Sequence, residues 1–341
     1  MPQMATKSDE DFMRQALALG RFGLGQTAPN PSVGCVLVKD GQVIATGITQ
    51  KGGRPHAEAM AIAAAGEAAA GATAYVSLEP CAHEGQTPPC ATTLIEAGIA
   101  RVVYAIDDPD PRVNGGGAVM LRDAGLTVDR EVLSDAARRD QRGFLLSKTD
   151  NRPMVTLKLA VSDNGFMRTP SGTDKWITGE LSRQMGHKLR AQHDAIITGS
   201  GTILEDDPSL DCRLPGLSDA SPVPVVMGRS DLPTESKLAK RSKSETVLHY
   251  NDEPPQVVLN DLATRGITRA MLECGPKLAA AFLSADLVDE LALFKASHEI
   301  ELDGESDISR MGLDLARFTL VAAHRLADDT YSHYYRNKED A

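Results

Sequence analysis

The sequence predicts an α/β protein with two domains, and three observations support this prediction. Short apolar segments typical of strands alternate with segments of helical periodicity along the whole chain. Few residues separate these segments, which favours layered sheets with a largely parallel portion. The length of 341 residues fits two ordinary domains, and a polar, proline-broken stretch at 147–152 predicts the boundary between them.

In the first half, Ser8 is the expected N-cap of a helix over 8–20, with Asp11 three residues later. Asp40-Gly41 predicts a tight hairpin between two strands within 33–47. The remaining pattern alternates between the two element types. Helices are expected over 56–71, 88–98 and 117–125, and strands over 73–79, 101–106 and 126–129.

The second half begins with a clear strand pattern and continues as a second α/β layer. Helices are expected over 179–194 and 276–286, and strands over 153–162, 195–201, 222–228, 257–260, 269–275 and 289–296. Two of these strands lead through Gly199, Gly201 and Thr202, or through Gly275, into helices. Such turns allow a dinucleotide phosphate to approach the backbone closely, although an ordinary strand-to-helix turn uses the same residues.

Composition excludes several classes of function. The net charge is −11 and both halves are acidic, so neither half resembles a surface for a polyanion. No apolar run reaches membrane-spanning length, and no basic segment followed by an apolar one opens the chain. Five cysteines, an odd number, do not suggest a disulfide framework, and a reducing, cytoplasmic setting is expected.

His56, Cys81 and Cys90 have the chemistry of a metal site. A catalytic zinc takes three protein ligands, from imidazole, thiolate or carboxylate, and keeps one position for water. His56 lies in the first turn of one expected helix, and Cys81 and Cys90 bracket a loop that leads into the next. The dipoles of the two helix starts favour thiolate over thiol. A structural zinc with a fourth ligand, for which His83 and Glu84 are the neighbouring candidates, is the alternative.

Glu58 follows the histidine by two residues and is expected to face the open position without binding the metal. There it would move a proton from water to a leaving amine. This spacing matches the H-x-E and P-C patterns of zinc deaminases, whose glutamate is not a ligand.

"TAPNPSVGCVLV", "HAEAMA" and "SLEPCAHEGQTPPC" resemble the deaminase half of bifunctional riboflavin-biosynthesis deaminase/reductases. The eight residues between Cys81 and Cys90 are typical of this branch of the cytidine-deaminase-like superfamily. The resemblance implies an α/β/α sandwich, zinc on His56, Cys81 and Cys90, and Glu58 as proton shuttle. It also implies substrate contacts from Asn30 and His83, which would otherwise be a turn residue and a loop histidine.

"PMVTLKLAVSDNG", "WITG", "LRAQHDAIITGSGTILEDDPSLDCR" and "LECGPKLAAAFL" resemble the reductase half of the same family, whose fold is dihydrofolate-reductase-like. The resemblance implies a deaminase domain over 1–148 and an NADPH-dependent reductase domain over 149–341, which tends to form homo-oligomers. The implied activity is deamination of a phosphoribosylamino-pyrimidine, followed by reduction of its ribosyl group to ribityl. The implied reductase residues are Lys158 and Asp206 near the reacting carbon, Ala160, Trp176, Thr202, Asp206 and Gly275 for NADPH, and Asp174, Arg190, Leu210, Arg213 and Glu273 for substrate.

Three departures bear on the second half. Asp174 replaces a serine that the family usually has, Cys212 replaces an apolar residue, and "KASHEIELDGES" replaces a Pro-Lys-Leu-Leu-Gly-Gly run. An active deaminase with a degenerate reductase half is therefore an alternative. A nucleic-acid base deaminase and a non-catalytic protein with structural zinc are the other two, and the acidic charge disfavours the first of these.

Overall fold

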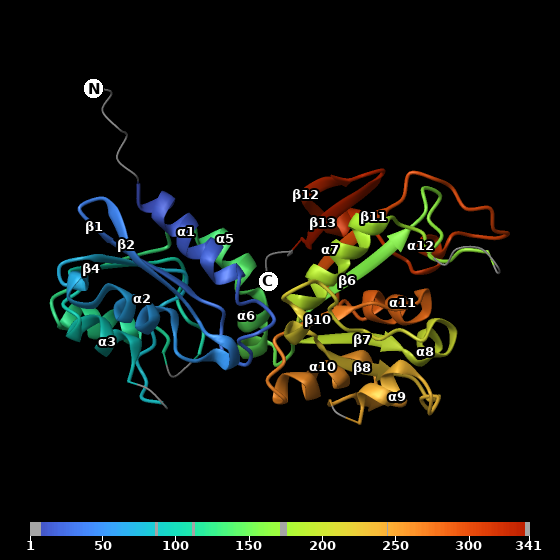
Figure 1. Cartoon of the computed structure of the whole chain (residues 1–341), viewed down its shortest axis with the longest axis horizontal. Coiled ribbons are helices and arrows are strands. Elements are labelled where there is room, and N and C mark those ends of the chain that lie inside the picture. Colours follow the sequence, from blue (N-terminus) through green and yellow to red (C-terminus); the bar gives the residue numbers. More distant parts are fainter. Residues whose placement is uncertain (1–7, 86–87, 111–112, 171–175, 244, 338–341) are drawn as a thin grey trace, which may run out of the picture. The chain divides into compact units, whose positions relative to one another are not determined.

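The computed structural model describes residues 8–85, 88–110, 113–170, 176–243 and 245–337. The chain divides into two compact units, Met1–Asp150 and Asn151–Ala341. Each unit is a sheet covered by helices, as the alternating pattern predicts (Figure 1). Among the described residues, no helix is long and apolar enough to cross a membrane.

The sheet of the first unit has five strands in the order β2-β1-β3-β4-β5. β1 runs antiparallel to both β2 and β3, whereas β3, β4 and β5 are parallel to one another. α1 and α5 cover one side of this sheet, and α2 and α3 cover the other (Figure 1). The strands are β1 (Gly34–Lys39), β2 (Gln42–Ile48), β3 (Thr73–Val76), β4 (Arg101–Tyr104) and β5 (Thr127–Arg130). The helices are α1 (Asp9–Arg21), η1 (Lys51–Gly53), α2 (Ala57–Ala65), η2 (Gly66–Ala69), α3 (Cys90–Glu96), α4 (Gly116–Asp123), α5 (Ser134–Asp140) and α6 (Arg142–Thr149).

Local sequence determines several element ends in this unit. Asp11 accepts a hydrogen bond from the backbone nitrogen of Ser8 at 3.0 Å, which caps α1 as predicted. Asp40 and Gly41 both have positive φ, at 51° and 73°, and they turn β1 into β2. The predicted helix start and hairpin are therefore confirmed.

Gly47 brings α2 unusually close to the sheet. A Cβ on Gly47 would lie 2.1 Å from the carbonyl oxygen of Ala57, closer than real Cβ contacts allow. Only glycine therefore permits β2 to pass beside the first turn of α2. Because Ala57 directly follows His56, this contact fixes the position of the histidine relative to the sheet.

The sheet of the second unit has eight strands in the order β12-β13-β11-β6-β10-β7-β8-β9. The strands from β11 to β9 are parallel, and β13 and β12 extend this sheet as an antiparallel pair. The strands are β6 (Met154–Val161), β7 (Ala195–Gly199), β8 (Val223–Met227), β9 (Leu248–Tyr250), β10 (Arg269–Leu272), β11 (Glu290–Lys295), β12 (Phe318–Leu326) and β13 (Asp329–Arg336). The helices are α7 (Glu180–Ala191), α8 (Ser200–Asp206), η3 (Ser218–Ala220), α9 (Lys237–Arg241), α10 (Pro255–Thr264), α11 (Pro276–Ser284), α12 (Asp307–Arg310) and η4 (Leu315–Arg317).

One predicted strand is wrong. Residues 257–260 form the middle of α10, not a strand. The buried side chains of α10 are Val258, Leu259 and Leu262, which is helical spacing, and Pro255 is its first residue. A four-residue apolar run does not distinguish a strand from one buried helical face.

The hairpin formed by β12 and β13 was not predicted from the sequence. Most side chains of β12 are exposed, including Leu320 and Val321, so the strand lacks the alternating apolar pattern of a half-buried strand. Pairing with β13, which itself pairs with β11, places it in the sheet. Pairing with β13, and not its own sequence pattern, therefore makes residues 318–326 a strand.

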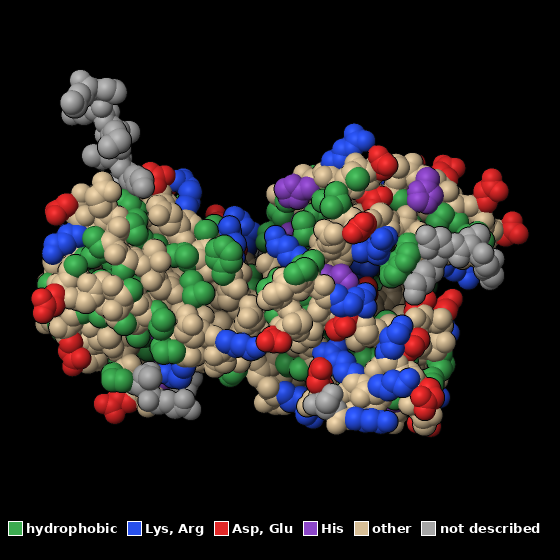
Figure 2. Space-filling model, in the orientation of Figure 1, with side chains coloured by type: hydrophobic (Ala, Val, Ile, Leu, Met, Phe, Trp, Pro, Cys, Tyr) green, Lys and Arg blue, Asp and Glu red, His purple; other side chains and the backbone are tan. Residues whose placement is uncertain are grey.

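Charge is mixed over the second unit. On the face drawn in Figure 2, Lys and Arg side chains are interspersed with Asp and Glu among the described residues. This distribution agrees with the acidic composition and offers no continuous basic surface on that face.

Candidate active sites

A cavity of about 270 Å³ lies in the first unit, where the ends of several loops and helices meet. Five of the predicted site residues line it: Asn30, His56, Glu58, Cys81 and His83.

Beside this cavity, three potential metal ligands converge. The Nδ1 atom of His56 lies 3.3 Å from Sγ of Cys90 and 3.7 Å from Sγ of Cys81. All three donor atoms lie within 4.8 Å of one another. One imidazole nitrogen and two sulfurs at this spacing fit zinc. In the part of the chain that the structure describes, neither His83 nor Glu84 joins this group, so the four-ligand structural site is not supported.

Three backbone features position these ligands. His56 is the N-cap of α2, and Cys90 is the first residue of α3. Cys81 lies in the loop after β3, and its sulfur accepts a hydrogen bond from the backbone nitrogen of Cys90 at 3.3 Å. The hydrogen bond from the Cys90 thiol, then those from His56 and this backbone nitrogen, lower the pKa of Cys81 to about 4. The same hydrogen bond raises the pKa of Cys90, so without a metal Cys81 is the thiolate of the pair, and metal binding would displace the proton of Cys90.

Glu58 lies in the first turn of α2 and is only 4% exposed. Burial, and then the charge of Cys81, raise the pKa of its carboxyl group to about 7. A carboxyl group with this pKa can both accept and release a proton near neutral pH. It lines the cavity without belonging to the three-donor group.

Glu79 has a structural role that sequence reasoning missed. Its buried carboxylate accepts hydrogen bonds from the backbone nitrogens of Asp108, Gly115 and Ala118, at 3.0–3.2 Å. Gly115 is the N-cap of α4, so the carboxylate occupies the anion-binding end of that helix.

Gly117, in the first turn of α4, holds the metal-binding loop in place. A Cβ there would lie 1.9 Å from the carbonyl oxygen of Pro80, the residue before Cys81. We expect Gly117→Ala to shift this loop, to destabilise the first unit by about 1–3 kcal/mol and to reduce zinc content. The matched control is Gly116→Ala, whose Cβ would meet only the Ala82 side chain, at 3.3 Å. Metal analysis and thermal unfolding check both variants; equal zinc content in the two would contradict the expectation.

Asn30 and His83 both line the cavity, as predicted from the resemblance. The side-chain nitrogen of Asn30 donates to the carbonyl oxygen of Gly53 at 2.8 Å, which orients its amide. Nδ1 of His83 is buried and has no hydrogen-bond partner among the described residues. The structure adds Asp108, whose pKa burial raises to about 6, and Lys148 to the cavity wall; neither was predicted.

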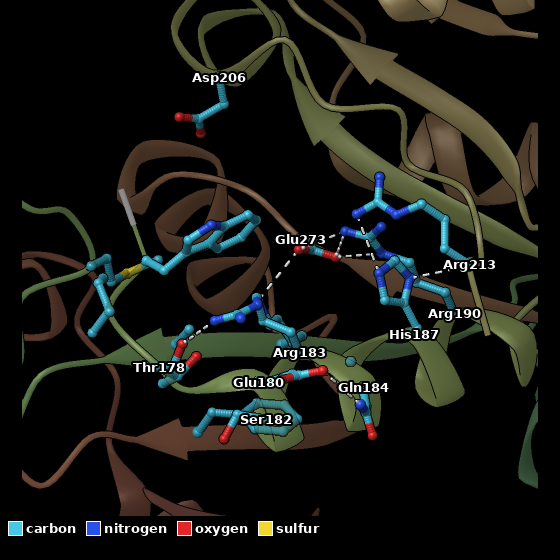
Figure 3. Close-up of a pocket in the computed structure, with 17 residues that line it drawn as sticks. Thr178, Glu180, Ser182, Arg183, Gln184, His187, Arg190, Asp206, Arg213 and Glu273 are labelled. Carbon is cyan, nitrogen blue, oxygen red and sulfur yellow. Dashed lines mark hydrogen bonds and ion pairs between the residues drawn. The ribbon is translucent and has the colours of Figure 1, made fainter. Parts of the chain in front are cut away.

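A larger cavity, of about 440 Å³, lies in the second unit (Figure 3). Strand β6 contributes Lys158 and Ala160, which are two residues apart and therefore on one face. An adjoining cavity of about 260 Å³ shares several of its residues and adds Thr202 and Leu210. The predicted residues that line the larger cavity are Lys158, Ala160, Trp176, Arg190, Asp206, Arg213 and Glu273.

Glu273 joins two cations in this cavity. Its carboxylate lies 3.3 Å from Nζ of Lys158 and 3.0 Å from Nη2 of Arg190. Burial alone would raise the pKa of Glu273, but these two cations outweigh burial and lower it to about 2. The Lys158 side chain is only 19% exposed, although a lysine on a strand could equally face solvent.

Trp176 is 48% exposed, so it is not part of the hydrophobic core. The guanidinium of Arg183 lies 5.0 Å from its ring centroid. Figure 3 shows Arg190, Arg213 and His187 side by side next to Glu273. Gly275 is the N-cap of α11 and lines neither cavity. Asp174 lies outside the described residues.

Sequence reasoning missed several lining residues of the larger cavity, mostly on α7: Thr178, Ser182, Arg183, His187 and Phe294. The available signal was helical spacing, because residues three or four before Arg190 share its helix face.

Known proteins resemble both units. The model of the cytidine and deoxycytidylate deaminase zinc-binding region matches residues 6–106, and that of the RibD C-terminal domain matches residues 153–300. Riboflavin biosynthesis protein RibD of Haemophilus influenzae is 39% identical over 84% of this chain and 85% of its own length. The Escherichia coli protein of that name is 36% identical over 90% of this chain and 92% of its own length. The structure of Acinetobacter baumannii RibD, 35% identical, covers 97% of this chain and 99% of its own with a TM-score of 0.86. The Thermotoga maritima deaminase/reductase structure is 32% identical and covers 96% of this chain and 99% of its own, also with a TM-score of 0.86.

Proposed function

Because this chain belongs to the RibD family of riboflavin biosynthesis proteins, we propose that its two cavities are the deaminase and reductase active sites of one bifunctional enzyme. The enzyme acts on a small-molecule pyrimidine. The proposed substrate is 2,5-diamino-6-(5-phosphoribosylamino)pyrimidin-4-one, which is first deaminated and then reduced at its ribosyl group. The cofactors are zinc and NADPH.

The observation that supports this proposal most strongly is that each compact unit has its own polar cavity with a different chemistry. The first cavity lies beside an imidazole and two sulfurs, and the second contains an ion-paired lysine, glutamate and arginine. We assign the deaminase domain to 1–148 and the reductase domain to 149–341. The division into compact units after Asp150 supports this assignment.

In the deaminase site, His56, Cys81 and Cys90 would hold the zinc ion, which supplies a Lewis acid that activates water for attack. Glu58 takes a proton from the attacking water and gives it to the amino group that leaves as ammonia. The ring carbon thereby exchanges its C–N bond for a C–O bond. Asn30 and His83 line the same cavity and would position the pyrimidine.

In the reductase site, NADPH supplies the hydride that the sugar carbon gains. Lys158 and Asp206 would lie near that carbon, and the Lys158 ammonium can donate the proton that the sugar oxygen gains. Arg190 and Arg213 would bind the phosphate, since guanidinium groups pair with it in a planar fork. Glu273 and Leu210 would contact the substrate as well.

The fold provides a place for a dinucleotide. β7 and β10 are neighbouring parallel strands; α8 begins directly after β7, and three residues separate the end of β10 from the start of α11. Both helix N-termini therefore lie at one sheet edge, where free backbone amides favour an anion. We assign Ala160, Trp176, Thr202, Asp206 and Gly275 to NADPH, and Asp174 to the substrate side from the family resemblance alone.

The alternative of a degenerate reductase half is not favoured. The RibD C-terminal model matches 153–300, and Lys158, Arg190, Arg213 and Glu273 line one cavity. We further propose a cytoplasmic homo-oligomer. The five free cysteines support the reducing location, and the family resemblance supports assembly through the reductase domain.

The proposed function is tested by product mass. With zinc and NADPH, we expect the substrate first to exchange one NH for an oxygen, a small increase in mass, and then to gain two hydrogens. Removing zinc with a chelator should stop the first step yet leave reduction of the separately supplied deaminated compound intact. Undiminished deamination by metal-free protein would refute the metal assignment.

A further inference from the structure

His187 lies on α7 and lines the larger cavity, three residues before Arg190 on the same helix face. It contacts the loop that carries Arg213. Its Nδ1 lies 3.2 Å from the carbonyl oxygen of Asp211, and its Nε2 lies 3.3 Å from Nη2 of Arg213 (Figure 3). The imidazole therefore bridges helix and loop at the guanidinium that we assign to the phosphate.

Each neutral form of the ring can accept one hydrogen bond from Arg213. With the proton on Nδ1, this atom donates to the Asp211 carbonyl and Nε2 accepts from the guanidinium of Arg213; with the proton on Nε2, Nδ1 accepts instead from the backbone nitrogen of Arg213, which lies 3.4 Å away. The first form satisfies two partners, the Asp211 carbonyl and the guanidinium, and the second satisfies only one. A second proton on Nε2 would place an N–H against the N–H of Arg213 and break this contact.

The surroundings favour the neutral ring. Burial, and then the charges of Arg190 and Arg213, lower the pKa of His187. The Asp211 carboxylate, which lies 3.4 Å from Nη1 of Arg213, opposes this effect but does not reverse it. Glu273 pairs with the guanidinium of Arg190, whose Nε donates to its carboxylate at 3.1 Å.

The loop is otherwise fixed to α7. The Cys212 thiol donates to the carbonyl oxygen of His187 at 3.3 Å, and Nη1 of Arg190 donates to that of Asp211 at 3.0 Å. The Arg213 side chain, however, is 55% exposed, and among the described residues it contacts His187, Ser209 and Asp211. Nε2 of His187 is thus one of the contacts that orient this guanidinium, beside the Ser209 hydroxyl at 2.8 Å from Nη1.

We propose that His187 is a positioning residue, which as a neutral imidazole directs Arg213 toward the phosphate of the reductase substrate and releases it when protonated. This inference rests on the proposed function. It predicts that substrate binding to the reductase weakens as pH falls below neutrality, while the chemical step does not change.

The test compares His187→Gln and His187→Leu in the full-length enzyme with zinc and NADPH. A glutamine amide can still accept from Arg213 and donate to the Asp211 carbonyl, but it does not titrate. At pH 8 we expect His187→Leu to raise the KM of reduction by about five- to tenfold with little change in kcat. His187→Gln should stay close to wild type. Because the pKa of His187 is lowered, the KM of the wild type should begin to exceed that of His187→Gln at pH 6, and the excess should grow as the pH falls further.

Three controls make the result specific. The substrate phosphate titrates in the same pH range, but it does so equally in both proteins, so the ratio of their KM values isolates His187. Thermal unfolding of the same variants reports on folding of the second unit, and the exposed His298→Gln provides a matched histidine substitution. The deaminated substrate without its phosphate should show no difference between wild type and His187→Leu.

The outcomes are separable. A KM for His187→Leu equal to that of wild type would refute the positioning role. A wild-type KM that falls relative to His187→Gln at pH 6 would also refute it, and would make protonated His187 a direct phosphate ligand. If wild-type enzyme does not oxidise NADPH with the deaminated substrate at all, the proposed function fails, and His187 is not the cause.

Discussion

Glu58→Gln is expected to abolish deamination while reduction continues. Glutamine keeps the size of the side chain but cannot accept a proton, and general acid–base catalysis contributes about a hundredfold to ten-thousandfold. The side chain is buried in the wall of the cavity and lies outside the three-donor group, so zinc content should not change. The measurement is ammonia release, with NADPH oxidation on the deaminated compound as a second readout.

A matched control is Glu67→Gln, an exposed glutamate that follows α2 in the same unit. It should have wild-type rates in both assays. Deamination by Glu58→Gln within a few-fold of wild type would remove Glu58 from the proton pathway. Loss of zinc in this variant would instead show that the carboxylate supports the metal site.

Lys158→Met is expected to reduce the rate of NADPH oxidation by about a hundredfold to a thousandfold, because removing one preorganised charge at a reacting centre costs this much. Methionine has a similar length but no charge. Glu273 would retain Arg190, whose guanidinium donates to it from Nε and Nη2 at 3.0–3.1 Å. The carboxylate therefore stays paired, and the second unit should remain folded.

Lys295→Met is the control for this substitution, since Lys295 lies on the neighbouring strand β11 and pairs with Asp163 at the surface. Exposed pairs of this kind contribute little to stability. Thermal unfolding and the rate of deamination should be unchanged in both variants. A Lys158→Met enzyme that reduces substrate at a rate near that of wild type would show that the lysine only neutralises the charge of Glu273.

Local sequence predicted most of the elements that carry the sites. Ser8, Asp40 and Gly41 determine a helix start and a hairpin through short-range hydrogen bonds and backbone conformation, which depend on few neighbours. The prediction was wrong for 257–260, because a short apolar run fits either element type. It missed β12 because a strand with most side chains exposed has no apolar pattern of its own.

The proposed deaminase residues were easier to predict than the residues that line the larger cavity of the second unit. His56, Glu58, Cys81 and Cys90 occur in two short motifs, and metal chemistry restricts which residue types can serve. His187, Arg183 and Thr178 have no such motif. They line the cavity only because α7 and the segment before it pack beside β6 and the loop at Glu273, and this packing depends on the whole second sheet.

By itself, the sequence determined the α/β class and the residues able to perform the deaminase chemistry, since these follow from residue type and local spacing; the reductase chemistry followed only from the family resemblance. Tertiary structure alone decided that Glu79 occupies the end of α4, that Glu273 joins Lys158 to Arg190, and that His187 contacts Arg213. These partners lie far apart along the chain. How the strands pair and the helices pack determines which carboxylate or imidazole contacts which cation. A local sequence pattern does not predict these contacts.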